Sequence, residues 1–138
     1  MIIVVDACIF LLALFGSRGA LTIITSQNHQ FYVPAKIVKE VDKQKKEVCK
    51  KLQITSEEFT TNLEALLKFV HVLQFIEYEP WMQKAKEALQ QRDVNDADYL
   101  ACALSVNANF LWTQDKDFGI QQLVPTKTTA QFIEERKH

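Results

Sequence analysis

Six acidic residues stand at or near the predicted ends of strands and helices in this chain of 138 residues. They are Asp6, Glu40, Asp93, Asp96, Asp115 and Asp117. Carboxylates that converge from such junctions suit Mg²⁺ or Mn²⁺, because hard cations take oxygen ligands and keep several waters. A cation held in this way lowers the pKa of water and neutralises a phosphate, which are the two requirements of phosphodiester hydrolysis. The acids therefore predict a metal-dependent hydrolytic site.

The same acids also have structural interpretations. Asp6 would cap a helix that follows it, and Glu40 would pair with Lys36 four residues earlier on one helix. The remaining acids would act as helix caps, first-turn acids or turn formers: Asp93, Asp96, Asp115 and Asp117. Their joint placement, rather than any single acid, favours a functional site.

The strands that must position these acids are short and apolar. Residues 2–5 form a continuous β-branched run, typical of a strand buried on both faces, and the run stops at Asp6. Further strands are predicted at 31–33, 72–76, 110–112 and 123–124. Residues 21–25 fit a helix or a strand equally well.

Helices are predicted between the strands. The first runs from Ile9 to a glycine cap at Gly16. Another covers 35–51, and it would place Lys36, Lys39, Lys43, Lys46 and Lys50 on a solvated face opposite the apolar stripe. Later helices are expected from Thr55, which has T-x-x-E capping-box spacing, from about 80 to 91, from Asp93-Val94-Asn95-Asp96 onward, and from about 129.

This alternation predicts an α/β fold in three layers, with a mostly parallel central sheet covered on both faces. Ligands of such sheets bind beyond the carboxyl ends of the strands. Asp6 and Asp115 each follow a strand, so we expect both at that edge.

Composition limits the alternatives. With 48% hydrophobic and 24% charged residues and no Gly/Ser-rich linker, residues 1–138 are expected to form one domain. The formal charge of -1 provides no overall electrostatic attraction for nucleic acid, so a local cation site would have to meet a phosphate. The apolar stretch 1–15 is too short to span a bilayer and lacks a basic start, so no membrane association is expected.

Cysteine and histidine usage favours a cytoplasmic protein with reduced thiols. Cys8, Cys49 and Cys102 are widely spaced and none belongs to a C-x-x-C pair. The three histidines are equally scattered, which argues against a zinc site.

Four segments resemble the PIN-domain pattern, and together they extend over essentially the whole chain. They are Val4-Val5-Asp6, Val33-Pro34 followed by Glu40, Asp93-x-x-Asp96-Ala97-x-x-Leu100-Ala101, and Trp112-Thr113-x-Asp115-Lys116-Asp117-Phe118. The last two segments are the more specific ones. The helical insertion between Glu40 and Asp93 is most similar to prokaryotic single-domain PIN proteins, which include VapC-like ribonuclease toxins.

The resemblance implies a Mg²⁺- or Mn²⁺-dependent endoribonuclease acting on RNA. It implies catalytic roles for Asp6, Glu40, Asp96 and Asp115, metal binding by Asp6, Asp96, Asp115 and Asp117, and accessory roles for Asp93 and Thr113. It further implies a homodimer and, for a toxin, an antitoxin protein as partner.

One departure from the family pattern keeps an alternative open. Cys8 stands where many relatives carry Asn, Ser or Thr, and a thiol is a poorer hydrogen-bond partner for a carboxylate or phosphate. We expect Cys8 to be a small buried apolar group, not a nucleophile. The alternative is a PIN-like domain that binds RNA or a protein without cutting; DNA cleavage is a third hypothesis.

Overall fold

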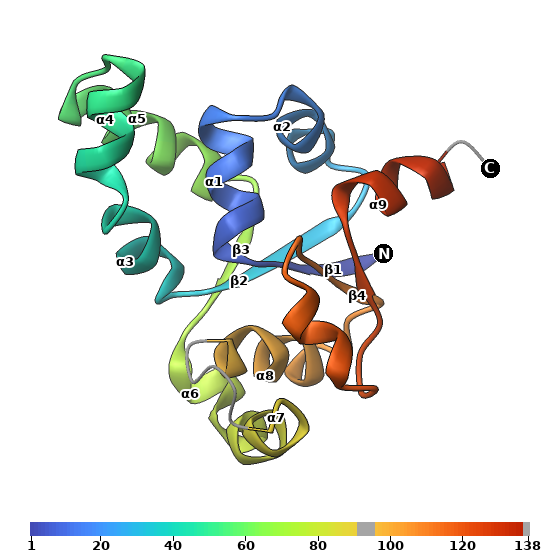
Figure 1. Cartoon of the computed structure of the whole chain (residues 1–138). Coiled ribbons are helices and arrows are strands. Elements are labelled where there is room, and N and C mark those ends of the chain that lie inside the picture. The colour runs from blue at the N-terminus through green and yellow to red at the C-terminus, as the bar shows by residue number, and fades with distance from the viewer. Residues whose placement is uncertain (91–95, 137–138) are drawn as a thin grey trace.

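The computed structural model describes residues 1–90 and 96–136. Five strands, all paired in parallel, form one sheet in the order β3-β2-β1-β4-β5. The strands are β1 (Ile2–Val5), β2 (Gln30–Pro34), β3 (His71–Leu73), β4 (Phe110–Trp112) and β5 (Thr126–Lys127). Helices cover both faces of this sheet (Figure 1). The predicted α/β fold with a parallel central sheet is confirmed.

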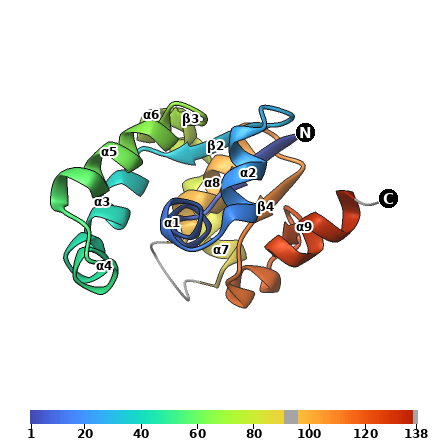
Figure 2. The same cartoon turned by 90° about the horizontal axis from the view of Figure 1, so that it is seen from above.

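The helices divide between the two sides of the sheet (Figure 1). One side carries α1 (Ala7–Phe15), α2 (Arg18–Thr25), α3 (Ile37–Asp42), α4 (Lys45–Leu52) and α5 (Ser56–Leu67). The other carries α6 (Phe75–Tyr78), the 3-10 turn η1 (Glu79–Trp81), α7 (Met82–Ala88) and α8 (Ala97–Ser105). The chain ends with the 3-10 turn η2 (Lys116–Ile120), strand β5 and α9 (Thr129–Arg136). Figure 2 shows α4 and α9 at opposite ends of the molecule.

Strand β1 lies at the centre of the sheet and of the core. Ile3, Val4 and Val5 are fully buried, as expected for a strand that helices cover on both faces. Val5 is in register with Trp112 of β4, so the residues that follow these two strands come side by side. Those residues are Asp6 and Thr113, and the register therefore begins to build the site.

Local capping signals predicted several helix ends correctly. The Asp6 side chain caps α1, and the helix closes at Gly16. Thr55 and Glu58 form the expected capping box at the start of α5. The ambiguous residues 21–25 belong to helix α2. In the described part of the chain, no single helix reaches the length and apolarity of a membrane span, although α1 and α2, bent by 104°, meet that criterion as a pair.

The prediction of one helix over 35–51 was wrong. The segment divides into α3 and α4, and the backbone N–H of Gln44 bonds the carbonyl of Val41, three residues back, at the break. Val41 is buried in α3, which packs on α1, whereas α4 contains no buried residue and packs on α5. Two different packing partners explain why one apolar stripe cannot continue through both helices.

The strand predicted at 72–76 ends at Leu73. Gln74 and Glu77 form a capping box that starts α6 directly after the strand. The backbone N–H of Gln74 bonds the Glu77 carboxylate at 2.7 Å, which turns the chain into a helix. A side-chain cap thus overrides the apolar run.

The strand predicted at 123–124 lies instead at Thr126–Lys127. The buried Gln121 side chain accepts hydrogen bonds from the N–H groups of Leu123 and Val124, at 2.8 and 3.0 Å. These groups are therefore unavailable to the sheet, and pairing with β4 begins only after Pro125.

Candidate active site

Asp6 is the first acid at the carboxyl end of the sheet, and its two oxygens have different partners. Oδ1 accepts a hydrogen bond from the backbone N–H of Ile9 at 2.9 Å, which caps α1. Oδ2 accepts a short hydrogen bond from the Thr113 hydroxyl, which follows β4. The capping role and the site role that the sequence left open are thus compatible in one carboxylate.

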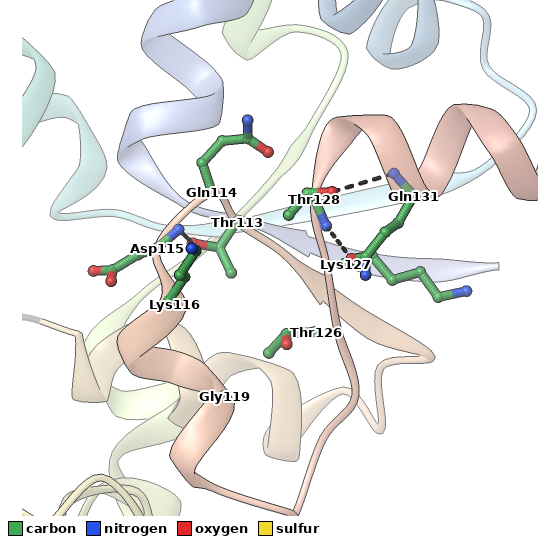
Figure 3. Close-up of a pocket in the computed structure, with 9 residues that line it drawn as sticks. All are labelled: Thr113, Gln114, Asp115, Lys116, Gly119, Thr126, Lys127, Thr128 and Gln131. Atoms are coloured by element: carbon green, nitrogen blue, oxygen red, sulfur yellow. Dashed lines mark hydrogen bonds between the residues drawn. The ribbon is translucent and has the colours of Figure 1, made fainter.

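Thr113 links Asp6 to Asp115. Its hydroxyl oxygen accepts a hydrogen bond from the backbone N–H of Asp115 at 2.9 Å, and Oδ1 of Asp115 accepts from the N–H of Asp117 at 2.9 Å. Figure 3 shows the Asp115 carboxylate pointing away from the strand end at which Thr113 lies. The predicted turn-forming role of Asp115 is confirmed, because its side chain caps η2.

The charges at this edge repel one another. Asp6 is only 5% exposed, and burial raises its pKa from 3.8 to about 6, with smaller upward contributions from the charges of Asp115 and Glu40. The hydrogen bonds from Thr113 and Ile9 act in the opposite direction. Asp6, Asp115 and Glu40 are therefore close enough to interact, and their combined negative charge favours a cation.

Glu40 is oriented by two neighbours from different elements. Its Oε2 accepts a hydrogen bond from the Tyr99 hydroxyl at 2.9 Å, and its Oε1 lies 3.1 Å from the ammonium of Lys36. Oε1 is buried without a well-formed hydrogen bond, so Lys36 acts on it as a charge. Burial and the Glu40 carboxylate raise the pKa of the Tyr99 hydroxyl, which keeps it a donor. The predicted pair of Lys36 and Glu40 is confirmed.

Sequence analysis missed Asp98 and misplaced Lys36. Asp98 is 9% exposed, its Oδ1 lies 3.0 Å from the Lys36 ammonium, and its Oδ2 accepts from the Tyr78 hydroxyl at 2.6 Å. Lys36 therefore lies between two carboxylates and not on the solvated face predicted for it. The signal was available, because an acid inside the apolar helix sequence Ala97–Ala103 requires a buried partner.

The other predicted acids have less defined places. Asp96 stands at the N-terminal end of α8, where its side chain makes no capping hydrogen bond. Asp117 is exposed, and its carboxylate forms no hydrogen bond or ion pair with the described part of the chain. Asp93 lies outside the described residues. The site roles of these three residues stay predictions.

Cys8 differs from expectation. The side chain was predicted to be a small buried group, but it is exposed beside the acids. Burial of the thiol, followed by the charges of Asp6 and Asp115, raises its pKa. The thiol is thus protonated at neutral pH and suits neither metal binding nor nucleophilic attack, in agreement with the expectation that it is no nucleophile.

The carboxylates at this edge fit a hard divalent cation that keeps most of its waters. Among residues 1–90 and 96–136, no three His, Cys, Asp or Glu side chains gather closely enough to hold a metal. Mg²⁺ nevertheless binds through one or two carboxylates and otherwise keeps its waters. Asp6 and Asp115, both oxygen donors whose charges repel each other, fit such an open site.

A polar pocket of about 310 Å³ adjoins Asp115. It lies between η2 on one side and β5 with the start of α9 on the other, and Thr113 forms part of its wall (Figure 3). The side chains of Gln114, Lys116, Lys127 and Gln131 also contribute to it. The acidic edge is therefore next to a space large enough for a small ligand.

Comparisons with known proteins identify the fold and the family. No curated protein matches the sequence. The fold is similar to that in the crystal structure of VapBC2 from Rickettsia felis bound to a DNA fragment from their promoter, with a TM-score of 0.73 and 15% sequence identity. The match covers 93% of this chain and 98% of that chain. The family described as PIN domain matches residues 4–137. The chain therefore belongs to the PIN-domain family, whose members are generally nucleases that use divalent metals.

Proposed function

We propose that this chain is an endoribonuclease that cuts RNA with the help of Mg²⁺ or Mn²⁺. The observation that carries the proposal is the chain of hydrogen bonds from Asp6 through Thr113 to Asp115, at the edge where β1 and β4 end. The raised pKa of Asp6 supports it, because burial and the nearby charge of Asp115 both disfavour the ionised carboxylate there, and a bound cation would offset both. Residues 1–138 would act as one domain.

In this mechanism Asp6 and Asp115 would hold the cation. When bound, the cation would neutralise phosphate charge and supply a water that is acidic enough to react near neutral pH. Thr113 fixes the orientation of Asp6, and its hydroxyl is itself fixed by the N–H of Asp115. Glu40, held by Tyr99, would orient the attacking water. Asp96 and Asp117 would complete the acidic cluster once RNA is bound, with Asp93 as an accessory acid.

Cleavage of a fluorescently labelled single-stranded RNA in Mn²⁺ tests the proposal. Asp6→Asn and Asp115→Asn should each lower the rate by more than about 100-fold, since even residues that only orient metal ligands are worth 10–100-fold. Asp42→Asn is the matched control, because Asp42 is an exposed acid on α3. Equal rates for all three variants would refute the assignment. A DNA strand of the same sequence tests the DNA hypothesis.

We further propose that the protein is the toxin of a toxin-antitoxin pair and acts as a homodimer in the cytoplasm. The support is the similarity in fold to a VapBC2 structure, together with the free state of Cys8, Cys49 and Cys102. Expression of the chain alone should arrest growth, and co-expression of a small protein encoded beside it should restore growth. Light scattering of the purified chain would measure the dimer.

A second candidate function is RNA or protein binding without cleavage. The specific observation in its favour is that Lys36 already neutralises Glu40 and Asp98, at 3.1 and 3.0 Å. With the Lys36 ammonium in place of a metal ion, the domain would keep its fold but would not cut RNA. Calorimetry that finds Mn²⁺ binding only at millimolar concentration, with no RNA turnover, would favour this candidate.

A further inference from the structure

The pocket beside Asp115 has walls that mainly offer hydrogen-bond donors. Gln114 Oε1 accepts from the N–H of Thr129 at 2.9 Å, and Gln131 Oε1 accepts from the N–H of Thr128 at 2.8 Å. A backbone N–H requires an oxygen opposite it, so these bonds decide which end of each amide is the NH₂ group. Neither Nε2 donates to another part of the described chain. Two oriented donors are thus left for a ligand.

Two lysines add positive charge to the same walls. Lys116 is exposed at the start of η2. The Lys127 ammonium pairs with Glu135 and lies 4.6 Å from the centre of the Phe110 ring. Figure 3 shows that Gln131 points from α9 toward Thr128 and that Lys116 comes from the opposite wall. A ligand between these walls would need several acceptor atoms.

The pocket and the acidic edge share residues. Thr113 and Asp115 belong to both, since Thr113 donates to Asp6 and both residues line the pocket. An RNA strand whose phosphate lies at Asp6 and Asp115 would therefore bring a neighbouring nucleotide to the pocket. A volume of about 310 Å³ is at the lower end of the range for ligand sites, about 300–1,000 Å³, which suits one nucleotide and not several.

We propose that this pocket is a subsite for one RNA nucleotide whose base presents carbonyl oxygens, such as uracil, next to the phosphate that is cut. The proposal rests on the ribonuclease function proposed above and adds a base preference to it. The amide NH₂ groups of Gln114 and Gln131 would donate to base oxygens, and Lys116 would meet the adjoining phosphate. Adenine is disfavoured, because its exocyclic amine is a donor and would face other donors.

Gln131→Glu changes the pocket without disturbing its frame. Gln131 and Thr128 bond each other reciprocally at the start of α9, as in a capping box, and Glu is equally suited to that position. The substitution keeps the oxygen that accepts from Thr128 and replaces the donor by an acceptor. Asn62→Asp is the matched control, since it makes the same amide-to-acid change at an exposed position on α5.

Gly119→Leu provides an independent variant. Gly119 lines the pocket, and a Cβ added there would meet no atom within 4 Å, so a side chain can enter the open space without a clash. Its backbone φ is not in the left-handed region, which allows leucine without strain. Melting temperatures of both variants would verify that the fold is retained.

The test measures the binding of labelled U12 and A12 oligoribonucleotides by fluorescence anisotropy in Mg²⁺, with Asp6→Asn as the inactive parent. The parent should bind U12 about tenfold more tightly than A12, the order of discrimination given by one well-placed pair of hydrogen bonds. Gln131→Glu should abolish this preference while Asn62→Asp retains it. Gly119→Leu should weaken the binding of U12. Equal binding of both oligonucleotides by the parent, or an unchanged preference in Gln131→Glu, would overturn the subsite.

Cleavage by the wild-type sequence separates the two proposals. Cleavage in Mn²⁺ with no base preference would overturn the subsite and leave the nuclease standing. A base preference in binding that Gln131→Glu removes, without cleavage by the wild type, would support the subsite as a binding site and overturn the nuclease. Neither binding nor cleavage would overturn both.

Discussion

Two groups of carboxylates lie near the carboxyl edge of the sheet, and they differ in how their negative charge is balanced. Glu40 and Asp98 share the ammonium of Lys36, and each also accepts a hydrogen bond from a tyrosine hydroxyl. Among the described residues, Asp6 and Asp115 accept only from neutral donors, a hydroxyl and backbone N–H groups. The first group has a counter-ion within the protein, whereas the second forms no ion pair in the described part of the chain.

The difference indicates which acids already have a counter-ion within the fold and which could bind a cation. A buried acid with an internal cation contributes to packing and would resist a second cation. A buried acid without one has a raised pKa, as Asp6 has, and gains from metal binding. Acidic side chains a short distance apart thus take different roles, because Lys36 pairs with Glu40 and Asp98 and not with Asp6 and Asp115.

Removing that lysine should have the largest effect on stability. Lys36→Met would leave Glu40 and Asp98 without their cation and should lower the free energy of unfolding by about 3–5 kcal/mol, as for other broken buried pairs. Urea unfolding at pH 7 measures this loss. Lys39→Met, an exposed residue on the same helix, should change stability by less than about 0.5 kcal/mol. Similar losses in both variants would contradict the comparison.

Asp6→Asn should act in the opposite direction. The folded pKa of Asp6, about 6, is above its ordinary value of 3.8, so the native state binds the proton more tightly than the unfolded state does. The contribution of Asp6 to the free energy of unfolding is therefore fully present below about pH 4, and it is lost as the pH rises through about 6. Asn removes this penalty and should raise the free energy of unfolding at pH 7 by up to roughly 3 kcal/mol.

Unfolding curves of wild type and Asp6→Asn between pH 4 and pH 8 would check this expectation. The wild type should lose stability across that range relative to the variant, and the two curves should converge at the acid end. Asp42→Asn serves as a control, because this residue is exposed and its removal should preserve the wild-type curve. A variant less stable than wild type at pH 7 would contradict the expectation, because it would show that other groups of the protein already balance the charge of Asp6.

Divalent metal should stabilise the acidic edge by a slightly smaller amount. Mn²⁺ at 100 times its dissociation constant should add about 2.7 kcal/mol to the wild type. Because protons compete for Asp6, the same Mn²⁺ concentration should stabilise less at pH 5 than at pH 7.5. Thermal melts with and without Mn²⁺ measure both values, and Asp115→Asn should remove the effect. Equal stabilisation at the two pH values would place the ion elsewhere.

Removing the tyrosine hydroxyls that bond Glu40 and Asp98 should cause the smallest losses of stability, and it separates the roles of these two acids. Tyr99→Phe and Tyr78→Phe each remove one hydrogen bond to a carboxylate and should cost about 1.5–3 kcal/mol. Only Tyr99→Phe should also slow RNA cleavage, because Glu40 and not Asp98 belongs to the proposed mechanism. Tyr32→Phe is the control, since in the described part of the chain its hydroxyl bonds only the exposed Gln30. Equal cleavage by Tyr78→Phe and Tyr99→Phe would remove Glu40 from the mechanism.

Much of the fold could be predicted because its signals are local. The β-branched run of β1, the glycine at the end of α1 and the capping box of α5 each act within a few residues. The errors at 72–76 and 123–124 have a common cause. In both places a polar side chain, Glu77 in the first and Gln121 in the second, accepts from a nearby backbone N–H group, and apolar periodicity does not reveal that competition.

The candidate site could be predicted in part. Asp6 and Asp115 were found because each acid directly follows a strand of a parallel sheet, and the ends of such strands lie at one edge. Asp98 was missed because its partner Lys36 is 62 residues away in sequence. That pairing depends on how α8 packs on β2, the strand that Lys36 follows, which no periodicity describes.

The amino-acid order alone was thus sufficient for the parallel α/β frame and for the two acids at its edge, since the alternation of strands and helices and the helix caps follow from neighbouring residues. Which acids are neutralised, and which pocket borders them, depended on folding. Charge balance is set by distances of about 3 Å between side chains from separate elements, and only the packed structure brings those side chains together.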